Sequence, residues 1–437
     1  MSSNQELQKR REQAMARGMP SQLPVYIDRA ANAELWDVEG RRYIDFGTGI
    51  AVLNTGHRHP GVQAAVQQQL ERFSHTCFMV TPYESAVALA EKLNVLAPGK
   101  TPKKSLFVTT GAEAVENAVK IARVHTGRTG VISFGGSFHG RTLLAMGLTG
   151  KVAPYKAGFG PFPADIYHAP FPIAYHGISV ADSLAGLERL FAEDIEPTRV
   201  AAIIIEPVQG EGGFYIAPPE FLRALRALCD QHGIVLIADE IQTGFGRTGR
   251  MFAMEHSGVE PDLMTVAKSL AGGFPLAGVI GKAHIMDAPA PGGLGGTYAA
   301  SPVGCAAALA VLEAMEAEKL PARANHIGEL ITGRLRTLAQ RFNCIGDVRG
   351  LGAMVAMELV KDGKANQPDA DLARDLVQAA ARNGLVLLSC GRYKNVMRFL
   401  VALTASDVLI NEGLDILERS LEELLRTSAP AAIQRQA

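Results

Sequence analysis

The stretch Ile234-Val-Leu-Ile-Ala-Asp239 is a short apolar run that ends in an acid, and a second run, Leu263-Met-Thr-Val-Ala-Lys268, ends in an amine. Uninterrupted apolar runs of this length are typical of strands buried on both faces of a parallel sheet. Ligands of open α/β sheets bind outside the carboxyl ends of such strands. We therefore expect Asp239 and Lys268 to meet in one ligand site.

An acid and a buried amine in one site favour pyridoxal phosphate as the ligand. Burial lowers the pKa of a lysine and leaves the neutral amine that forms a Schiff base. An acid beside the ring nitrogen of the cofactor keeps that nitrogen protonated. Taken alone, Lys268 could instead be an ordinary surface lysine, because most lysines are exposed. Asp239 could likewise be a turn or capping acid.

Composition excludes several classes of protein. The chain has 437 residues, which predicts a large domain plus a smaller one. Lys and Arg number 43 against 44 Asp and Glu, so there is no electrostatic case for nucleic acid or membrane partners. The five cysteines are scattered, which indicates reduced thiols in a cytoplasmic protein rather than disulfides or a zinc site. No apolar run has the length of a signal or transmembrane segment.

The order of predicted elements indicates an α/β fold. Strands and helices alternate from about residue 60 to 310, which favours a mostly parallel sheet. Pro60 is placed to open a helix over 60–72, and an amphipathic pattern predicts a second helix from Glu84 to Leu96. A hairpin pattern precedes this region and a compact α+β pattern follows it. We therefore predict an N-terminal part of the small domain at 1–58, a large cofactor-binding domain at 59–315, and a C-terminal part of the small domain at 316–437. The tail after Thr427 is rich in Ala, Pro and Gln, and we expect it to be disordered.

Two further loops follow predicted strands. Thr109-Thr-Gly-Ala-Glu113 joins a strand to a helix N-terminus, where free backbone N–H groups can bind an anion, although an ordinary βα connection has the same pattern. The loop after the next strand carries Phe138, His139 and Arg141. A third strand ends at Glu206, and we expect the glycine-rich segment that follows, residues 209–213, to be a flexible loop.

Two competing motifs are rejected. Gly244-Phe-Gly-Arg-Thr-Gly249 fits the dinucleotide-binding pattern, but the glycines lie five residues beyond the strand and Asp239 would repel a pyrophosphate. His57 and His59 are close in sequence but have no third ligand nearby, so we expect no metal site.

Three stretches carry a family resemblance: Leu236-Ile-Ala-Asp-Glu-Ile-Gln-Thr-Gly-Phe-Gly-Arg-Thr-Gly249, Pro261-Asp-Leu-Met-Thr-Val-Ala-Lys268 and Leu270-Ala-Gly-Gly273. They resemble the signature of the class III pyridoxal-phosphate-dependent aminotransferases, and the likeness extends over nearly the whole chain. It implies fold type I, with a mostly parallel central sheet in the large domain and a small α+β domain built from both termini. It also implies a homodimer, or a dimer of dimers, with the site at the subunit interface.

The resemblance assigns the cofactor-binding residues. Lys268 would hold the cofactor as a Schiff base and later shuttle a proton, and Asp239 would keep the pyridine nitrogen protonated. The remaining cofactor contacts would come from Gly111 and Ala112 at the phosphate, Phe138 stacked on the ring, His139 beside it, Gln242 at the ring hydroxyl, and Thr297 of the neighbouring subunit at the phosphate. Many relatives have Ser or Thr where this chain has Ala112, so one hydroxyl contact is missing here.

Within the class, the segments 49–57, 74–78, 206–215 and 388–398 are similar to the 4-aminobutyrate aminotransferases. The similarity implies that Arg141 binds the distal carboxylate of each substrate and Arg398 the carboxylate beside the keto group of 2-oxoglutarate. Glu211 would pair with Arg398 when a 4-amino acid is bound, because an unpaired buried charge is costly. Ile50 would pack against the substrate chain, and Glu206 would complete the substrate-binding set.

Several activities stay open at this point. A 5-aminovalerate aminotransferase differs by one methylene of substrate, and another omega-amino acid or ornithine-type aminotransferase shares much of the motif set. A lyase or racemase could use the same cofactor. The chain could also be a regulator that binds the cofactor without being an enzyme, although it has no DNA-binding extension.

Overall fold

The computed structural model describes residues 2–433, with side chains as far as Arg426. Its largest element is a seven-stranded sheet in the order β4-β12-β11-β10-β7-β5-β6. The strands are β4 Lys103–Val108, β12 Ala277–Lys282, β11 Leu263–Val266, β10 Val235–Asp239, β7 Val200–Ile205, β5 Gly130–Phe134 and β6 Ile166–Ala169. β12 runs antiparallel to both of its neighbours, and the pairs among β11, β10, β7, β5 and β6 are parallel. The mostly parallel sheet that we predicted is confirmed.

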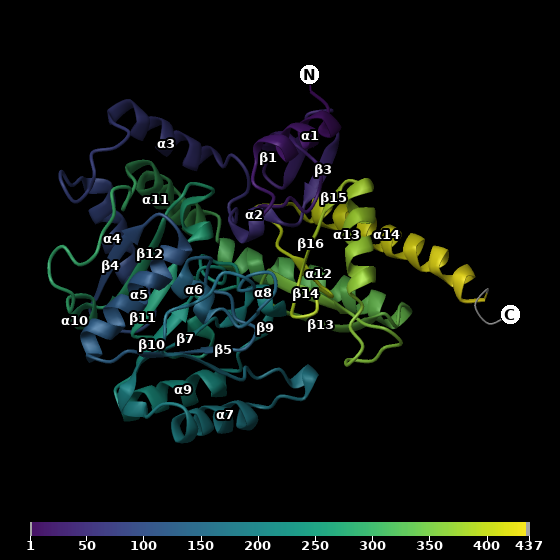
Figure 1. The fold of residues 1–437 in the computed structure, drawn as a ribbon. Coiled ribbons are helices and arrows are strands. Elements are labelled where there is room, and N and C mark those ends of the chain that lie inside the picture. The colour runs from purple at the N-terminus through teal and green to yellow at the C-terminus, as the bar shows by residue number, and fades with distance from the viewer. Residues whose placement is uncertain (1, 434–437) are drawn as a thin grey trace.

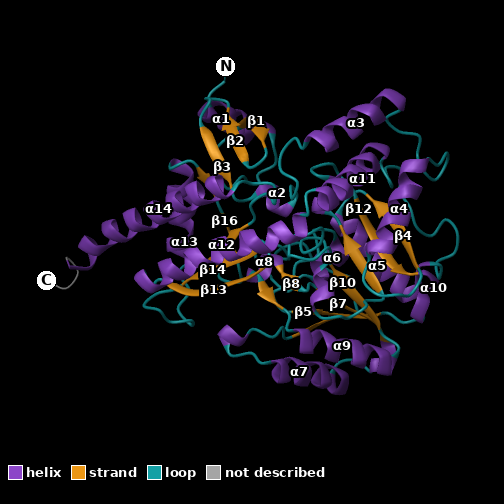
Figure 2. Cartoon of the chain, turned by 180° about the vertical axis from the view of Figure 1, so that it is seen from behind, coloured by secondary structure: helices purple, strands orange, loops and turns teal. Residues whose placement is uncertain are grey.

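Each face of this sheet is covered by its own hydrophobic core. On β10, Val235 and Ile237 point into a core shared with α5 (Gly111–Thr126), whereas Leu236 and Ala238 point into a core shared with α9 (Pro219–His232). α9 and α7 (Val180–Glu193) lie below the sheet (Figures 1 and 2). Burial of alternate residues on opposite faces explains the continuous apolar run in the sequence.

The two ends of the chain build a second, smaller unit (Figure 1). The N-terminal hairpin strands β1 (Ile27–Ala31), β2 (Glu34–Asp37) and β3 (Arg42–Asp45) form a sheet with β15 (Leu385–Val386), which pairs parallel to β3. A further sheet has the order β13-β14-β17-β16, with β13 Ile345–Leu351, β14 Met354–Leu359, β17 Val396–Phe399 and β16 Leu388–Cys390. The helices of this unit are α1 Asn4–Ala14, α12 Leu320–Arg341, α13 Ala370–Arg382 and α14 Asp407–Ile433. This pairing joins the two ends of the chain in one sheet, and the exact domain bounds that we gave stay a prediction.

Local signals in the sequence explain where the main helices begin. α3 (Pro60–Arg72) starts at a proline, and α4 (Glu84–Leu96) covers the range that we predicted. The remaining elements are α2 Thr48–Ala51, α6 Leu143–Leu148, α8 Gly210–Gly213, α10 Ala283–Met286, α11 Pro302–Ala317, β8 Val208–Gln209, β9 Tyr215–Ile216, and the 3₁₀ turns η1 Ala174–His176, η2 Pro197–Arg199, η3 Ala253–His256 and η4 Lys268–Ala271. In the described residues, no helix combines the length and the apolar character needed to cross a membrane.

One expectation about a flexible segment is wrong. The segment 209–213 is not a flexible loop, because its glycines pack tightly: a Cβ at Gly210 would lie 2.1 Å from Gln242 Oε1, and one at Gly212 would lie 2.6 Å from the carbonyl oxygen of Gly136. The disorder that we expect after Thr427 stays a prediction: α14 is described as far as Ile433, and residues 434–437 lie outside the described part of the chain.

Candidate active site

A cavity of about 620 Å³ opens at the carboxyl ends of β10 and β11. Most of the residues predicted for the site line it. They are Gly111, Ala112, Phe138, His139, Arg141, Glu206, Glu211, Asp239, Gln242 and Lys268, and Val52 and Ile241 line it as well. The sheet geometry thus brings together residues from five separate stretches of the chain, as expected for an open α/β sheet.

Asp239 is the last residue of β10 and is fixed by three hydrogen bonds. Its Oδ1 accepts from Thr265 Oγ1 at 3.0 Å and from the N–H of Ile241 at 3.2 Å, and its Oδ2 lies 2.7 Å from Nδ1 of His139. Both side chains are almost fully buried. The carboxylate is therefore rigid, and it faces the cavity from below.

Lys268 follows β11 directly and begins the 3₁₀ turn η4, with a positive φ of 46°. A non-glycine residue in this left-handed conformation is strained and is often found at functional sites. The amine projects into the cavity, and burial lowers its pKa below the ordinary lysine value. The charge of Glu211 is the largest influence that raises this pKa, and it does not cancel the effect of burial. The neutral amine needed for Schiff-base chemistry is favoured at this position.

The N-terminus of α5 offers two free amides to an anion. Thr110 caps this helix, and Glu113 accepts hydrogen bonds from the N–H groups of Thr109 and Thr110 at 2.8 and 2.7 Å. Within the described residues, the N–H groups of Gly111 and Ala112 have no such partner. Both residues line the cavity, where the positive end of the helix dipole favours a phosphate.

Two unpaired buried atoms fit the rest of the cofactor. Gln242 Oε1 and His139 Nε2 are buried in residues that line the cavity, and neither has a hydrogen-bond partner in the described structure. A buried polar atom without a partner is uncommon in a native protein. The ring of Phe138 also lines the cavity and can cover a planar ligand. A phosphate site, an aromatic face, a fixed acid and a reactive amine together fit pyridoxal phosphate.

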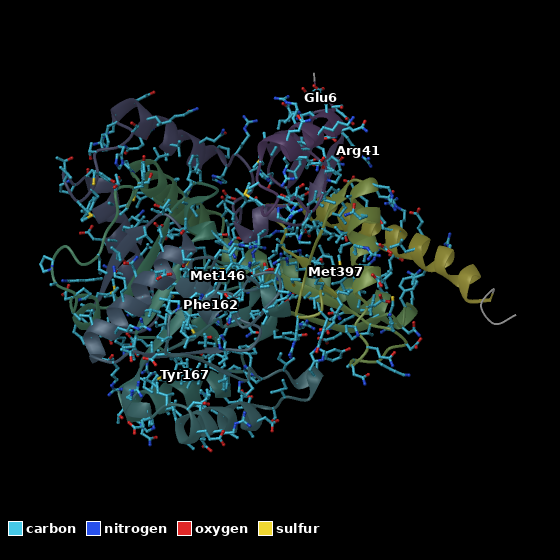
Figure 3. The ribbon with its side chains drawn as sticks, viewed as in Figure 1. Glu6, Arg41, Met146, Phe162, Tyr167 and Met397 are labelled. Carbon is cyan, nitrogen blue, oxygen red and sulfur yellow. The ribbon has the colours of Figure 1, made fainter. Side chains whose placement is uncertain are left out.

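Two arginines have opposite environments. Arg398, on β17 next to the labelled Met397 (Figure 3), is 2% exposed and pairs through Nη1 with Oε1 of Glu211. Burial is the largest single influence on the pKa of Glu211 and raises it, but the charge and hydrogen bond of Arg398, with smaller contributions from Lys268 and Tyr155, together hold that pKa below its usual value. Arg141 lines the cavity and is exposed, and no carboxylate of the described residues forms an ion pair with it.

Glu206 lies beneath two of the site loops. One carboxylate oxygen accepts from the N–H of Phe138 at 2.8 Å, and the other accepts from the N–H of Gly210 at 2.9 Å. Burial raises the pKa of this carboxyl group to about 7. Because both oxygens accept hydrogen bonds from the backbone, the side chain can support the loop that carries Phe138 and the start of α8, which carries Glu211.

Three predicted site residues do not line the cavity of their own chain: Arg398, which pairs with the lining residue Glu211, and two more, Ile50 and Thr297. Ile50 is 43% exposed with a positive φ of 65°, two residues before Val52, which does line it. Thr297 lies in a separate, shallow cavity with Val108, Thr109 and Glu113. The roles of all three residues stay predictions.

Besides Val52 and Ile241, which line the cavity, sequence reasoning missed Tyr155, which contacts two of the lining residues. Tyr155 is 8% exposed, its hydroxyl donates to Glu211 Oε2 at 3.3 Å, and its ring lies 4.9 Å from the guanidinium carbon of Arg141. It follows α6 in a segment without a recognisable motif, so only the folded structure reveals it.

Comparisons with known proteins agree with this geometry. The sequence model of the class-III aminotransferases matches residues 14–421. The chain is 58% identical to the 5-aminovalerate aminotransferase of Pseudomonas putida over 422 residues, covering 97% of this chain and 99% of the relative. It is 56% identical to the 4-aminobutyrate aminotransferase of Escherichia coli over 423 residues, with the same two coverages.

A solved structure supports the choice of cofactor. An amine transaminase from an uncultivated Pseudomonas species, solved in its PLP-bound form, superposes with a TM-score of 0.86 at 30% identity, covering 94% of this chain and 98% of the other. The family match, the relatives and the residues that line the cavity lead to one conclusion. This chain belongs to the class III aminotransferases and is a transaminase that depends on pyridoxal phosphate.

Proposed function

We propose that this enzyme transfers the amino group of 4-aminobutyrate to 2-oxoglutarate and forms succinate semialdehyde and L-glutamate. The observation that carries the proposal is the pairing of Glu211 with Arg398, which leaves Arg141 as the cation open to a substrate. In this state the cavity presents one free guanidinium, which matches a donor with a single carboxylate far from its amine.

The second substrate needs the other arginine. 2-Oxoglutarate and L-glutamate have two carboxylates, and the one beside the reacting carbon requires a second cation. Arg398 becomes available when Glu211 turns away from it. The enzyme can then serve both classes of substrate in turn, because neither state leaves a buried arginine without a counter-charge.

The residues around Lys268 supply the proton chemistry. Bound pyridoxal phosphate provides a ring that stabilises negative charge on the substrate carbon next to the transferred nitrogen. Asp239, fixed by His139 and Thr265, is placed to hold a proton on the ring nitrogen. Lys268, with its lowered pKa, is the base that removes the proton from the donor carbon and the acid that returns it to the acceptor carbon.

The other residues hold the reactants in place. Gly111 and Ala112 are placed to bind the phosphate, Phe138 to cover the ring and Gln242 to accept from the ring hydroxyl. We assign Glu206 a positioning role. Its two oxygens accept backbone hydrogen bonds from Phe138 and from Gly210, which precedes Glu211 at the start of α8. Ile50 at the donor chain and Thr297 at the phosphate of the neighbouring subunit complete the proposed site.

The proposal includes the assembly and its setting. We propose a homodimer, or a dimer of dimers, in the cytoplasm, with the small domain formed by 1–58 and 316–437 around the large domain 59–315. The exposed apolar side chains of Met79, Val80 and Tyr298 lie in segments next to Thr297, which supports an interface there.

5-Aminovalerate is a second candidate donor. The relative that acts on it is as similar to this chain as the 4-aminobutyrate enzyme is. One methylene in an apolar pocket changes discrimination by only about 1–3 kcal/mol. Both donors have one distal carboxylate, so both fit the state in which Glu211 covers Arg398.

The test compares kcat/KM for four amino donors with 2-oxoglutarate as acceptor and added pyridoxal phosphate. We expect 4-aminobutyrate to be the preferred donor, with 5-aminovalerate second. A preference for 5-aminovalerate would assign the enzyme to the second candidate. A preference for ornithine or N-acetylornithine, or the absence of any transfer, would overturn the proposal.

A further inference from the structure

Tyr155 touches both carboxylate-binding parts of the site. Its hydroxyl donates to Glu211 Oε2 at 3.3 Å, while Oε1 of the same carboxylate pairs with Arg398. Its ring lies 4.9 Å from the guanidinium carbon of Arg141 and 4.9 Å, centroid to centroid, from the ring of Phe138. In the described part of the chain, only Tyr155 both forms a hydrogen bond with Glu211 and places a ring against Arg141.

The surroundings of Tyr155 keep its hydroxyl a donor. The residue is 8% exposed, and burial, reinforced by the charge of Glu211, raises its pKa to about 12. The hydroxyl therefore stays protonated at neutral pH and donates to the carboxylate. The ring beneath Arg141 has a second effect, because a guanidinium over an aromatic face is held by cation–π attraction.

We propose that Tyr155 is a positioning residue that sets the donor preference of the enzyme. Its hydroxyl holds Glu211 over Arg398, the state that a single-carboxylate donor requires, and its ring holds Arg141 in place for the distal carboxylate of every substrate. This inference rests on the proposed function, since it assigns a structural cause to the choice between donors with one and with two carboxylates.

The two roles have separable consequences. 4-Aminobutyrate reacts from the state in which Glu211 covers Arg398, and L-glutamate reacts from the state in which Arg398 is open. Loss of the hydroxyl destabilises only the state in which Glu211 covers Arg398. The ratio of kcat/KM for 4-aminobutyrate to that for L-glutamate therefore falls by the same factor as the equilibrium constant between the two states, whichever state predominates in the free enzyme. Loss of the ring disturbs Arg141, which both donors use, so both values fall together.

The experiment measures single-turnover half-reactions of the pyridoxal-phosphate-loaded enzyme with each donor, in Tyr155→Phe and Tyr155→Leu. Tyr155→Phe should lower the ratio of 4-aminobutyrate to L-glutamate reactivity by about three- to tenfold, the value of one long hydrogen bond to a carboxylate. Tyr155→Leu should show that change and, in addition, a weaker apparent affinity for both donors. Tyr167→Phe serves as a matched control, because Tyr167 (Figure 3) lies on β6 and, among the described residues, forms no hydrogen bond with Glu211 and no ring contact with Arg141. The donor ratio of this variant should equal that of the wild type.

The outcomes separate this inference from the proposed function. A donor ratio in Tyr155→Phe within about twofold of the wild type would overturn the role of the hydroxyl, a margin set by the smallest hydrogen-bond contribution. Unchanged affinities in Tyr155→Leu would overturn the role of the ring. If the wild type reacts with L-glutamate but with neither 4-aminobutyrate nor 5-aminovalerate, the proposed function fails whatever the variants do. If the wild type prefers 5-aminovalerate, that donor takes the place of 4-aminobutyrate in the ratio.

Discussion

Replacing Glu211 with serine removes the counter-charge of Arg398 and leaves a guanidinium that is 2% exposed. Removing one partner of a buried ion pair costs about 3–5 kcal/mol. The smaller serine leaves space for water beside Arg398, and this water relieves part of the cost until a substrate enters. We assign about half of the cost, roughly 1.5–2.5 kcal/mol, to the moment when a single-carboxylate donor closes the site.

This energy affects the two donors differently. 4-Aminobutyrate leaves Arg398 without a partner in the variant, so its kcat/KM should fall by about 10- to 60-fold. L-Glutamate brings its own carboxylate to Arg398 and no longer has to displace Glu211. Its kcat/KM should therefore stay the same or rise.

The assay is the half-reaction of the cofactor-loaded Glu211→Ser enzyme with each donor, followed by the absorbance of the cofactor. Glu211→Gln is the matched variant, because it keeps the size of the side chain and loses only the charge, and it should show the same direction of change. An equal loss of activity toward 4-aminobutyrate and L-glutamate would refute the reasoning, since it would show that Glu211 supports the site without distinguishing its substrates.

Two further predictions concern stability. Gly212→Ala should lower the free energy of unfolding by about 1–3 kcal/mol and the Tm by several degrees, because the new Cβ would lie 2.6 Å from the carbonyl oxygen of Gly136. Gly333→Ala on α12 is the control. It has open space around it and should not lower the Tm. Lys268→Met should raise the Tm of the cofactor-free protein at neutral pH. In the wild type, the unfolded state binds a proton on Lys268 more readily than the folded state does, so protonation favours unfolding, and the variant lacks this effect. That gain should shrink as the pH rises toward the ordinary lysine pKa of 10.5, and thermal melts across this range that show a constant gain would contradict the lowered pKa.

Much of the fold could be predicted from the sequence because its signals are local. α3 and α4 have the bounds that we predicted, since a proline at the first position and an amphipathic pattern act within a few residues. The direction of β12 could not be predicted, because an apolar run has the same pattern in a parallel and in an antiparallel strand. The apolar segment 385–389 divides between β15 and β16 in two different sheets, and only tertiary packing decides that division.

The residues of the candidate site could also be predicted only in part from the sequence. Asp239 and Lys268 could be placed together because parallel strands end at one edge of a sheet. The glycines of α8 suggested flexibility, although in the structure they allow the close approach of Gln242 and Gly136. Tyr155 has no local signal at all, because its partner Glu211 lies 56 residues away in sequence. Contacts of that kind depend on how the elements pack.

The central claim is that Lys268 drives amino transfer from 4-aminobutyrate to 2-oxoglutarate. The most direct measurement follows an isotope label on the amino nitrogen of 4-aminobutyrate in reactions with 2-oxoglutarate and pyridoxal phosphate. The wild type should produce labelled L-glutamate and an equal amount of succinate semialdehyde, whereas Lys268→Ala, folded and able to bind the cofactor, should produce neither. Labelled glutamate from Lys268→Ala at the wild-type rate, or none from the wild type, would contradict the account.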